Sequence, residues 1–270
     1  MKSITIFLYG GFGNNLSQVN FGSTLEEKNI QVKYCDILTK KNIFTYILGW
    51  KIHEQTHKNL NLTYVNYNFF KLLKIFSVLL ISRILAKNVS NVFYEYNINS
   101  KEIDKLAAEK FKYFFGYFQS SIILKRGIKL QLFKEIRQLE SIDQIAIHIR
   151  GGDYSSINRL NESYYKKSLK LISQSNSPIK VFTNDKKYAE NILNLSDVYD
   201  YNFSGASPFD DFIEIARSRI IISGNSTFSI WSSICSDAVR IFIPKKKTNI
   251  MLQNFDLHEL NKNIEYIEVD

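Results

Sequence analysis

Apolar residues recur along this chain in two distinct patterns. Short apolar runs rich in β-branched and aromatic residues predict strands, and longer stretches with apolar residues three or four positions apart predict helices. The predicted strands are residues 3–9, 32–35, 92–96, 113–115, 144–148, 179–182, 220–223 and 239–243. The predicted helices are residues 15–28, 69–86, 122–139, 163–173, 208–218 and 225–235, with one more that starts near Asp185.

The alternation of strands with helices indicates an α/β protein whose parallel sheets are covered by helices on both faces. The natural division of the chain lies near residue 140, and no internal repeat is evident. We therefore predict two Rossmann-like domains facing a central cleft, formed by residues 1–140 and residues 141–270. A chain of 270 residues is long enough for two modest domains with their own cores.

The composition narrows the class of protein. Hydrophobic residues make up 45% and aromatic residues 14% of the chain, which indicates a packed globular protein rather than a disordered one. Cys35 and Cys235 lie far apart, which is no disulfide framework, so we expect a reducing compartment. The first apolar stretch is too short for a signal peptide and is better interpreted as a strand.

The net charge of +9 favours anionic partners. The cationic residues are dispersed apart from the run Lys245–Lys247, and no nucleic-acid-binding motif accompanies them. A phosphate-bearing substrate or a lipid surface therefore fits the charge better than a nucleic acid.

Residues 69–86 form the most apolar stretch of the chain, interrupted by Lys71, Lys74 and Arg83. The stretch is too charged and too short to span a bilayer, and it predicts a basic amphipathic helix. Two interpretations remain open, of which the first is favoured: a core helix with a solvated lysine face, or a helix that rests on anionic lipid.

No metal site is predicted. His53 and His57 have the spacing of the zinc motif H-E-x-x-H, but that motif also needs a helical context and a third ligand. The flanking residues are those of a surface segment, and the remaining histidines form no cluster with them.

Four predicted strands end in polar or glycine-rich loops, and ligands bind at the carboxyl ends of strands in open α/β sheets. The first loop, G-G-F-G-N-N, supplies glycines and a helix N-terminus that suit an anion or a sugar hydroxyl. The others are H-I-R-G-G-D-Y, T-N-D and S-G-N-S-T-F-S-I-W. In order, the four loops are Gly10–Asn15, His148–Tyr154, Thr183–Asp185 and Ser223–Trp231.

The second loop concentrates the most chemistry. His148, Arg150 and Asp153 bring acid/base and anion-binding groups to the end of one strand, and the two glycines between them permit a sharp turn. The alternative is a polar turn with a surface ion pair. In the other loops, Asp185 alone favours a helix N-cap, and Asn225, Ser226 and Thr227 suit either a phosphate site or a helix cap.

Together these motifs resemble those of glycosyltransferase family 11, the galactoside α-1,2-fucosyltransferases. That family carries H-x-R-R-G-D-Y, G-G-x-G-N-Q and G-Y-F-Q-S, together with F-S-D-D-like and N-S-S/T-F-S-W-W elements. The corresponding segments here are His148–Tyr154, Gly10–Asn15, Gly116–Ser120, Phe182–Asp185 and Asn225–Trp231. Three positions depart from the pattern: Gly151 stands for an arginine, Asn15 for a glutamine and Ile230 for a tryptophan.

The resemblance implies a GT-B-like fold and an inverting, metal-independent transfer of L-fucose from GDP-fucose to the 2-hydroxyl of a galactoside. No cofactor is implied, since GDP-fucose is the donor substrate. Arg150 would bind the β-phosphate and act in catalysis, with His148 and Asp153 as candidate bases. The remaining donor- or acceptor-binding candidates are Gly11, Gly13, Asn14, Asp185, Asn225, Ser226 and Thr227.

By analogy with that family, we expect a bacterial cytoplasmic enzyme of surface-polysaccharide (O-antigen) synthesis. The expected acceptor is a galactoside or an oligosaccharide, either free or lipid-linked. Peripheral contact with the cytoplasmic face of the inner membrane remains open. So do two other functions: transfer of another GDP-6-deoxyhexose such as colitose, and non-catalytic binding of a glycan or nucleotide on the same scaffold.

Overall fold

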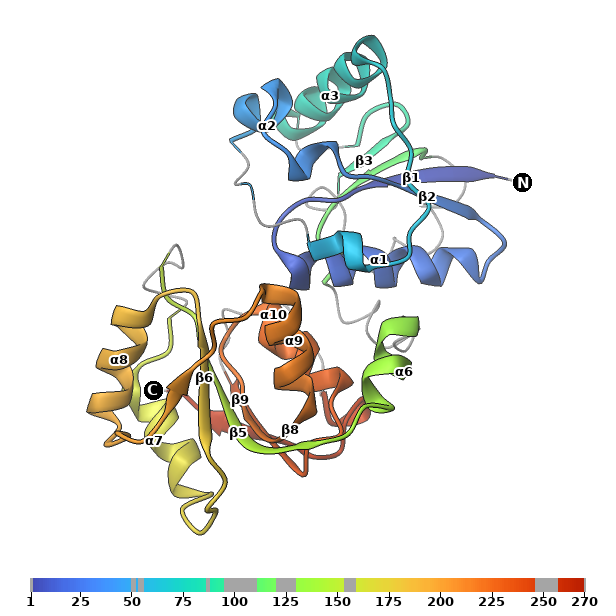
Figure 1. Ribbon diagram of the computed structural model, residues 1–270. Helices are drawn as coiled ribbons and strands as arrows, with labels where there is room; N and C mark the ends of the chain where they lie inside the picture. Colours follow the sequence, from blue (N-terminus) through green and yellow to red (C-terminus); the bar gives the residue numbers. More distant parts are fainter. Residues whose placement is uncertain are drawn as a thin grey trace. The chain divides into compact units, whose positions relative to one another are not determined.

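The fold is taken from a computed structural model that describes residues 2–49, 52, 56–85, 88–94, 111–119, 130–152, 159–245 and 257–269. The chain divides into two compact units, Met1–Leu130 (unit 1) and Gln131–Asp270 (unit 2). Each unit has its own parallel sheet with helices on both faces (Figure 1). The α/β class and the parallel sheets predicted from the sequence are confirmed.

The sheet of unit 1 has the strand order β2-β1-β4-β3, and every pair is parallel. β1 and β4 are therefore neighbours although β2 and β3 lie between them in the chain. The strands are β1 (Ser3–Phe7), β2 (Gln31–Cys35), β3 (Val92–Tyr94) and β4 (Tyr113–Phe115).

Helix α1 (Phe12–Glu26) covers one face of this sheet, and α2 (Ile43–Ile47) and α3 (Phe69–Ile84) cover the other (Figure 1). Neighbouring residues of β4 point to opposite faces, as the pleat of a strand requires. Phe114 contacts Phe21 of α1 at 5.9 Å, whereas Phe115 contacts Phe76 of α3 at 5.8 Å between ring centroids. Two 3₁₀ helices, Ile37–Thr39 and Thr56–Asn59, connect these elements.

Helix α1 begins earlier than the sequence predicts. Gly11 is its N-cap, and the Gly11 carbonyl accepts hydrogen bonds from the amides of Asn14 at 3.0 Å and Asn15 at 3.1 Å. Gly13 and Asn14 therefore lie in the first helical turn rather than in a loop. Of the helix predicted at 122–139, the structure contains α6 (Gln131–Arg137), and residues 120–129 lie outside the described ranges.

The six-stranded sheet of unit 2 has the order β10-β9-β8-β5-β6-β7, again with parallel pairs throughout. The chain builds outward from β5 through β6 to β7, and then on the other side from β8 through β9 to β10. The order therefore reverses between β5 and β8. The strands are β5 (Ile142–Ile149), β6 (Ile179–Thr183), β7 (Asn202–Phe203), β8 (Ser218–Ile222), β9 (Arg240–Lys245) and β10 (Ile264–Glu268).

Two groups of helices enclose this sheet (Figure 1). Ile145, Ile147 and Ile149 of β5 pack in one hydrophobic cluster with residues of α7 and α8. His148 points to the opposite face, where its ring lies 5.6 Å from the Phe228 ring of α10. The helices are α7 (Glu162–Lys170), α8 (Lys186–Leu195), α9 (Pro208–Arg217) and α10 (Thr227–Cys235), and a 3₁₀ helix, Leu257–Glu259, precedes β10.

Helix α6 packs within unit 2. Its Phe133 ring lies 5.5 Å from the Trp231 ring, and Arg137 donates to the carbonyls of Ile234 at 3.2 Å and Cys235 at 3.3 Å. These contacts explain why the boundary between the units precedes Gln131, whereas the sequence pattern places a division near residue 140.

Three parts of the sheets differ from the prediction. The edge strands β7 and β10 are additional to the predicted strands, and β9 continues through Pro244 instead of ending there. β8 pairs with β9 only as far as Phe242, so the missing N–H of Pro244 removes no hydrogen bond to β8. In the described part of the chain, no helix is long and apolar enough to cross a membrane.

Candidate active site

The carboxyl ends of β5 and β8 bring two of the predicted loops together. The strands are in parallel register with Ile147 opposite Ile222, so the residues that follow them emerge at the same edge. His148 lies in β5, Arg150 follows it, and the segment Asn225–Thr227 follows β8. This edge is also the point where the strand order reverses, which is where open α/β sheets bind ligands.

The two strand ends approach each other closely at Gly224. A Cβ atom on this glycine would lie 2.6 Å from Nδ1 and 2.8 Å from the carbonyl oxygen of His148. Such distances are shorter than real Cβ contacts, so the close approach requires glycine. The sequence gives no sign of this requirement, because Gly224 and His148 are far apart in the chain.

His148 is buried, with 6% of its surface exposed. Its Nδ1 has no hydrogen-bond partner among the described residues. Burial first, and then the positive charge of Arg150, lower the pKa of His148 to about 3. The imidazole is therefore neutral at physiological pH, and it is a much weaker base than a solvated histidine.

The N-terminus of α10 begins directly after β8. Ser226 is the N-cap: its Oγ accepts from the Ser229 amide at 3.3 Å, which confirms the capping interpretation. The Ser229 hydroxyl donates to the Gly224 carbonyl at 3.0 Å and fixes the turn. The first N–H groups of a helix have no partner within it, so this end of α10 suits an anion.

The third loop holds the second one in place. Gly151 N–H donates to Asn184 Oδ1 at 3.1 Å, and Gly152 N–H donates to Asp185 Oδ2 at 2.9 Å. The other carboxylate oxygen, Oδ1 of Asp185, accepts from the Tyr188 amide at 3.1 Å, so Asp185 is also the predicted N-cap of α8. The sequence predicts the cap but misses the link between the two loops.

The same packing accounts for Gly151 where the family motif has arginine. A Cβ atom at this position would lie 2.8 Å from Cδ1 of Tyr188 and 2.9 Å from Cβ of Asp185. A larger side chain would have to displace the start of α8. Asp153, the other predicted catalytic residue of this loop, lies outside the described residues.

The link through Asp185 predicts a pH-dependent stability difference. Its hydrogen bonds from the amides of Tyr188 and Gly152 hold the carboxyl pKa below its ordinary value. The charge therefore stabilises the fold above the pKa of the unfolded chain, and this contribution is lost as the pH falls through the folded pKa. We expect Asp185→Asn to lower the urea midpoint at pH 7, and the difference from the parent protein to shrink as the pH falls below about 4 and to vanish only below the folded pKa of Asp185. A midpoint difference that stayed constant across this range would show that the charge is irrelevant.

In unit 1, the first predicted loop meets the Gly116–Gln119 segment at the ends of β1 and β4. Asn14 Oδ1 accepts from Gln119 Nε2 at 2.7 Å, and the rings of Tyr9 and Tyr117 lie 4.8 Å apart. Gly11 is the N-cap of α1, and Gly13 lies in the first turn of this helix. Two elements of the family pattern are thus joined here by side-chain contacts.

Gln18 of α1, which the sequence analysis did not single out, connects these parts. Its Oε1 accepts from Asn15 Nδ2 at 3.0 Å, and its Nε2 donates to the Gly116 carbonyl at 2.9 Å. Gln18 is completely buried. The only signal in the sequence is the helical spacing of Gln18 from the apolar residues Phe21 and Leu25 of α1.

We expect Gln18→Met to lower the free energy of unfolding by about 2 kcal/mol, because the Gly116 carbonyl and the Asn15 amide would lose their buried partner. Gln31→Met, at an exposed position of β2 in the same unit, is the matched control and should change stability little. Urea denaturation measures both variants, and equal midpoints would show that Gln18 contributes no more than a surface residue.

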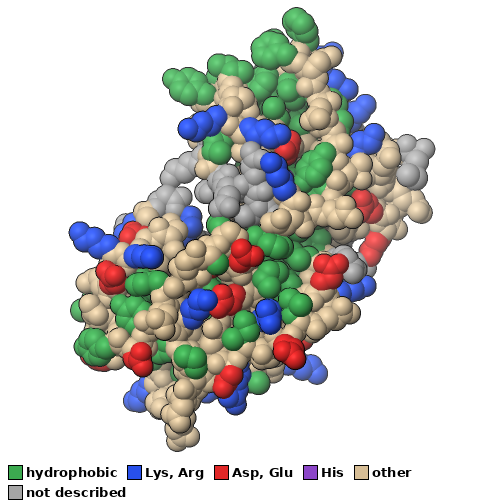
Figure 2. Space-filling model, in the orientation of Figure 1, with side chains coloured by type: hydrophobic (Ala, Val, Ile, Leu, Met, Phe, Trp, Pro, Cys, Tyr) green, Lys and Arg blue, Asp and Glu red, His purple; other side chains and the backbone are tan. Residues whose placement is uncertain are grey.

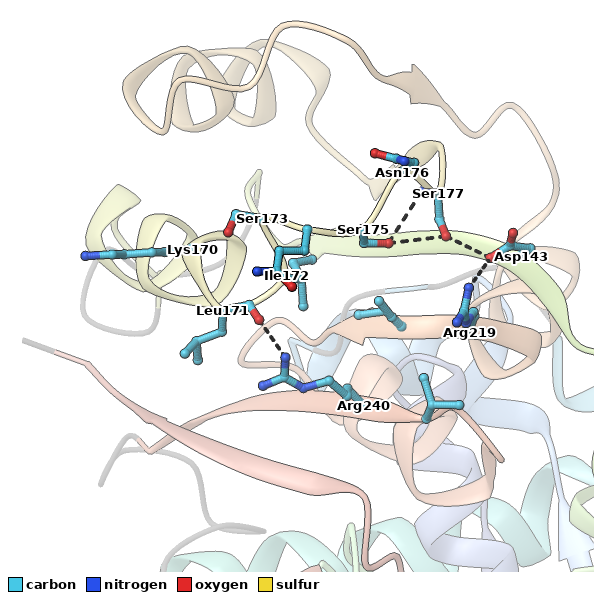
Figure 3. Close-up of a pocket in the computed structure, with 13 residues that line it drawn as sticks. Asp143, Lys170, Leu171, Ile172, Ser173, Ser175, Asn176, Ser177, Arg219 and Arg240 are labelled. Carbon is cyan, nitrogen blue, oxygen red and sulfur yellow. Dashed lines mark hydrogen bonds and ion pairs between the residues drawn. The ribbon is translucent and has the colours of Figure 1, made fainter.

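A cavity of about 830 Å³ lies at the opposite edge of the unit 2 sheet (Figure 3). Its two arginines are paired: Arg219 with Asp143 at 3.1 Å, and Arg240 with Glu265 at 2.7 Å. It contains none of the predicted site residues, so we place the candidate site at the carboxyl edge, where the motif loops converge. Within the described ranges, no group of three or more His, Cys, Asp or Glu side chains is arranged to hold a metal ion.

Comparison with known structures identifies the class first. The fold is GT-B-like: the E. coli heptosyltransferase WaaC with ADP superposes with a TM-score of 0.53 at 8% identity, covering 99% of this chain and 93% of WaaC. The fucosyltransferase NodZ from Bradyrhizobium has a TM-score of 0.44 at 14% identity, covering 89% of this chain and 95% of NodZ. A search of curated protein sequences finds no match.

The sequence profile of glycosyl transferase family 11 matches residues 67–269. The chain therefore belongs to this family and is a glycosyltransferase. The match includes the three motif loops of unit 2 and the Gly116–Gln119 segment, and it begins after the first loop. The family predicted from the sequence motifs is confirmed.

Proposed function

We propose that this protein transfers L-fucose from GDP-fucose to the 2-hydroxyl of a galactoside, with inversion and without a metal ion. The observation that carries the proposal is the meeting of the His148–Gly152 and Asn225–Thr227 segments at one strand-order reversal in a family 11 chain. The same proposal places the reaction in the bacterial cytoplasm, in the synthesis of surface polysaccharide such as O-antigen.

The leaving group defines what unit 2 must supply. Cleavage of the bond between fucose and the β-phosphate leaves negative charge on GDP, and a metal-free enzyme must stabilise it with cations and N–H donors. Arg150 provides a planar guanidinium that binds phosphate with two hydrogen bonds. Thr227 and the first amides of α10, with Asn225 and Ser226 at its start, provide the N–H and hydroxyl donors.

Inversion requires the acceptor hydroxyl to attack the anomeric carbon from the face opposite GDP while a base takes its proton. The low pKa and the burial of His148 favour Asp153 as that base. We assign His148 to positioning: its ring packs beside Phe228, and its backbone lies against Gly224.

The remaining candidates divide by unit. Both carboxylate oxygens of Asp185 accept hydrogen bonds from backbone amides. We therefore assign Asp185 to positioning the Gly151–Gly152 turn rather than to direct contact with guanine or ribose. In unit 1 we assign Gly11, Gly13 and Asn14 to the acceptor or to the transferred fucose.

Two other functions use the same scaffold. Transfer of another GDP-6-deoxyhexose, such as colitose, would use the same phosphate contacts. No motif is specific for the hydroxyl groups that distinguish these sugars. A non-catalytic nucleotide- or glycan-binding protein would be supported only by Gly151, and the close packing of Tyr188 and Asp185 around this glycine is a structural reason for its presence.

The test is GDP release from GDP-fucose in the presence of EDTA, across a panel of β-galactoside acceptors, with GDP-colitose as the second donor. Acceptor-dependent release from GDP-fucose, with the product linkage established by NMR, is the expected result. Release from GDP-colitose alone would assign the other donor. GDP binding without turnover on any acceptor would favour the binding protein, and no GDP binding would contradict all three.

A further inference from the structure

Helix α3 carries two apolar stripes. One stripe, which includes Leu72, Ile75 and Leu79, is buried and packs in the core of unit 1. The other stripe is exposed: Phe70 has 80% and Ile84 has 73% of its surface exposed. The exposed residues Leu73, Leu80 and Ile81 lie between them at helical spacing. The favoured sequence interpretation, a core helix with a solvated lysine face, accounts only for the first stripe.

Helix α2 extends the exposed stripe. Phe44 of α2 lies 5.9 Å from the Phe69 ring and 4.5 Å from the Phe76 ring, so the two helices pack together. Tyr46 and Ile47 on the outer side of α2 are 84% and 61% exposed. We name this surface the α2–α3 face, and Figure 2 shows hydrophobic side chains gathered over this part of unit 1. Its apolar members are Ile43, Tyr46, Ile47, Phe69, Phe70, Leu73, Leu80, Ile81, Ile84 and Leu85.

An apolar surface of this extent is unusual. Soluble monomers rarely expose large contiguous apolar patches, and a larger patch normally marks a surface that binds protein or membrane. The exposed side chains here are long or aromatic and stand on two regular helices, so they form a continuous surface rather than isolated positions.

Positive charge predominates around this face, although Lys40 pairs with Asp36 at 2.8 Å. Residues 37–53 and 55–94 contain no Asp or Glu. All the Lys and Arg side chains of these segments that the structure describes are exposed, and Lys and Arg appear beside the hydrophobic side chains in Figure 2. These cations are Lys40, Lys41, Lys58, Lys71, Lys74 and Arg83.

We propose that the α2–α3 face docks on an anionic lipid bilayer, with α3 lying in the plane of the interface. The apolar stripe would enter the boundary between headgroups and acyl chains, while the long cationic side chains reach the lipid phosphates. Charge complementarity selects this occupant, because a second copy of the chain would set the same cations against one another. The inference is independent of which donor or acceptor the enzyme uses.

The test is co-sedimentation of the protein with vesicles of phosphatidylcholine alone or of phosphatidylcholine mixed with anionic phosphatidylglycerol, to which surface Lys and Arg are attracted. We expect binding only to the anionic vesicles. It should weaken as salt rises, since the Debye length falls from about 10 Å at 0.1 M to about 3 Å at 1 M.

Two variants separate the apolar and ionic contributions. Phe70→Gln/Ile84→Gln removes the two most exposed positions of α3, and Lys41→Glu/Lys74→Glu reverses two charges. Each should weaken vesicle binding at least about tenfold. Tyr199→Gln/Val239→Gln is the matched control, because these side chains of unit 2 are 74% and 54% exposed. All three variants should keep the thermal midpoint and the GDP release with a soluble acceptor, so a failure of docking is distinct from a failure of the proposed reaction.

Three results would overturn the proposal. The first is a parent protein that does not bind anionic vesicles at low salt. The second is a Phe70→Gln/Ile84→Gln variant that binds them as well as the control does. The third is a protein that does not bind vesicles but forms a concentration-dependent dimer, which sedimentation velocity detects and Phe70→Gln/Ile84→Gln abolishes. That result would assign the face to contact between copies of the chain.

Discussion

Replacing Arg150 with alanine is expected to lower kcat/KM for GDP-fucose about 1,000-fold, the upper range for loss of one preorganised charge-stabilising donor. Arg150 follows β5 at the reversal of strand order, and α10 begins after the neighbouring strand β8. Its guanidinium would stabilise the diphosphate as the bond to the sugar breaks, and water that replaced it would have to reorganise during the reaction. Initial rates of GDP release at varied donor concentration measure the effect.

Two further variants make this result specific. Arg150→Lys keeps the charge but loses the planar fork, so it should recover only part of the lost activity. Arg219→Ala removes an arginine from the opposite edge of the same sheet, where it pairs with Asp143 at 3.1 Å. A surface ion pair of this kind contributes about 0–1 kcal/mol, so activity should stay near that of the parent. Equal kcat/KM for Arg150→Ala and Arg219→Ala would refute the phosphate assignment.

Most of the central strands were predictable from local pattern. The apolar runs at the carboxyl ends of β5 and β8 are buried on both faces of a parallel sheet, and such runs give a strong apolar signal. The edge strands β7 and β10 were missed, because a short strand with one pairing partner needs no continuous apolar run. The early start of α1 was missed because a glycine cap leaves no side-chain signature.

The candidate site was predictable as a set of loops but not as an arrangement. The pattern placed His148, Arg150 and the Asn225–Thr227 segment at strand ends, and the sheet then brought them to one edge. What fixes the arrangement is non-local: the Asn184 and Asp185 side chains bind amides 33 residues away, and Gln18 reaches a carbonyl 98 residues away. Contacts over such separations depend on which strands become neighbours, and residue spacing alone does not encode this.

The amphipathic helix shows a different limit. The sequence of α3 has apolar residues at enough positions for two stripes, and hydrophobicity by itself does not say which stripe meets the sheet. Packing against Phe115 and α2 selects the stripe that contains Phe76. The sequence therefore supported a core helix and a surface helix at once, and in the structure α3 has the properties of both.

The second large effect is expected from Gly224→Ala. The added methyl group would meet Nδ1 of His148 at 2.6 Å and its carbonyl oxygen at 2.8 Å. The carbonyl belongs to β5 and cannot rotate away, so β8 and β5 must separate at their carboxyl ends. We expect the free energy of unfolding to fall by about 3 kcal/mol, at the upper end for overpacking, and activity to fall with it. Urea denaturation gives the first quantity and GDP release the second.

A cycle with His148 distinguishes this clash from a general effect of alanine. Gly205→Ala is the control for the substitution itself, because nothing lies within 4 Å of the added Cβ, and its midpoint should match or slightly exceed that of the parent. His148→Ala relieves the contact with the imidazole but leaves the carbonyl in place. The double variant should therefore recover part of the stability lost on Gly224→Ala, giving a coupling energy of about 1 kcal/mol or more between the two positions. Strict additivity would mean that the imidazole does not contribute to the clash, and a stable Gly224→Ala protein would mean that β5 and β8 do not approach as closely at this edge as the geometry requires.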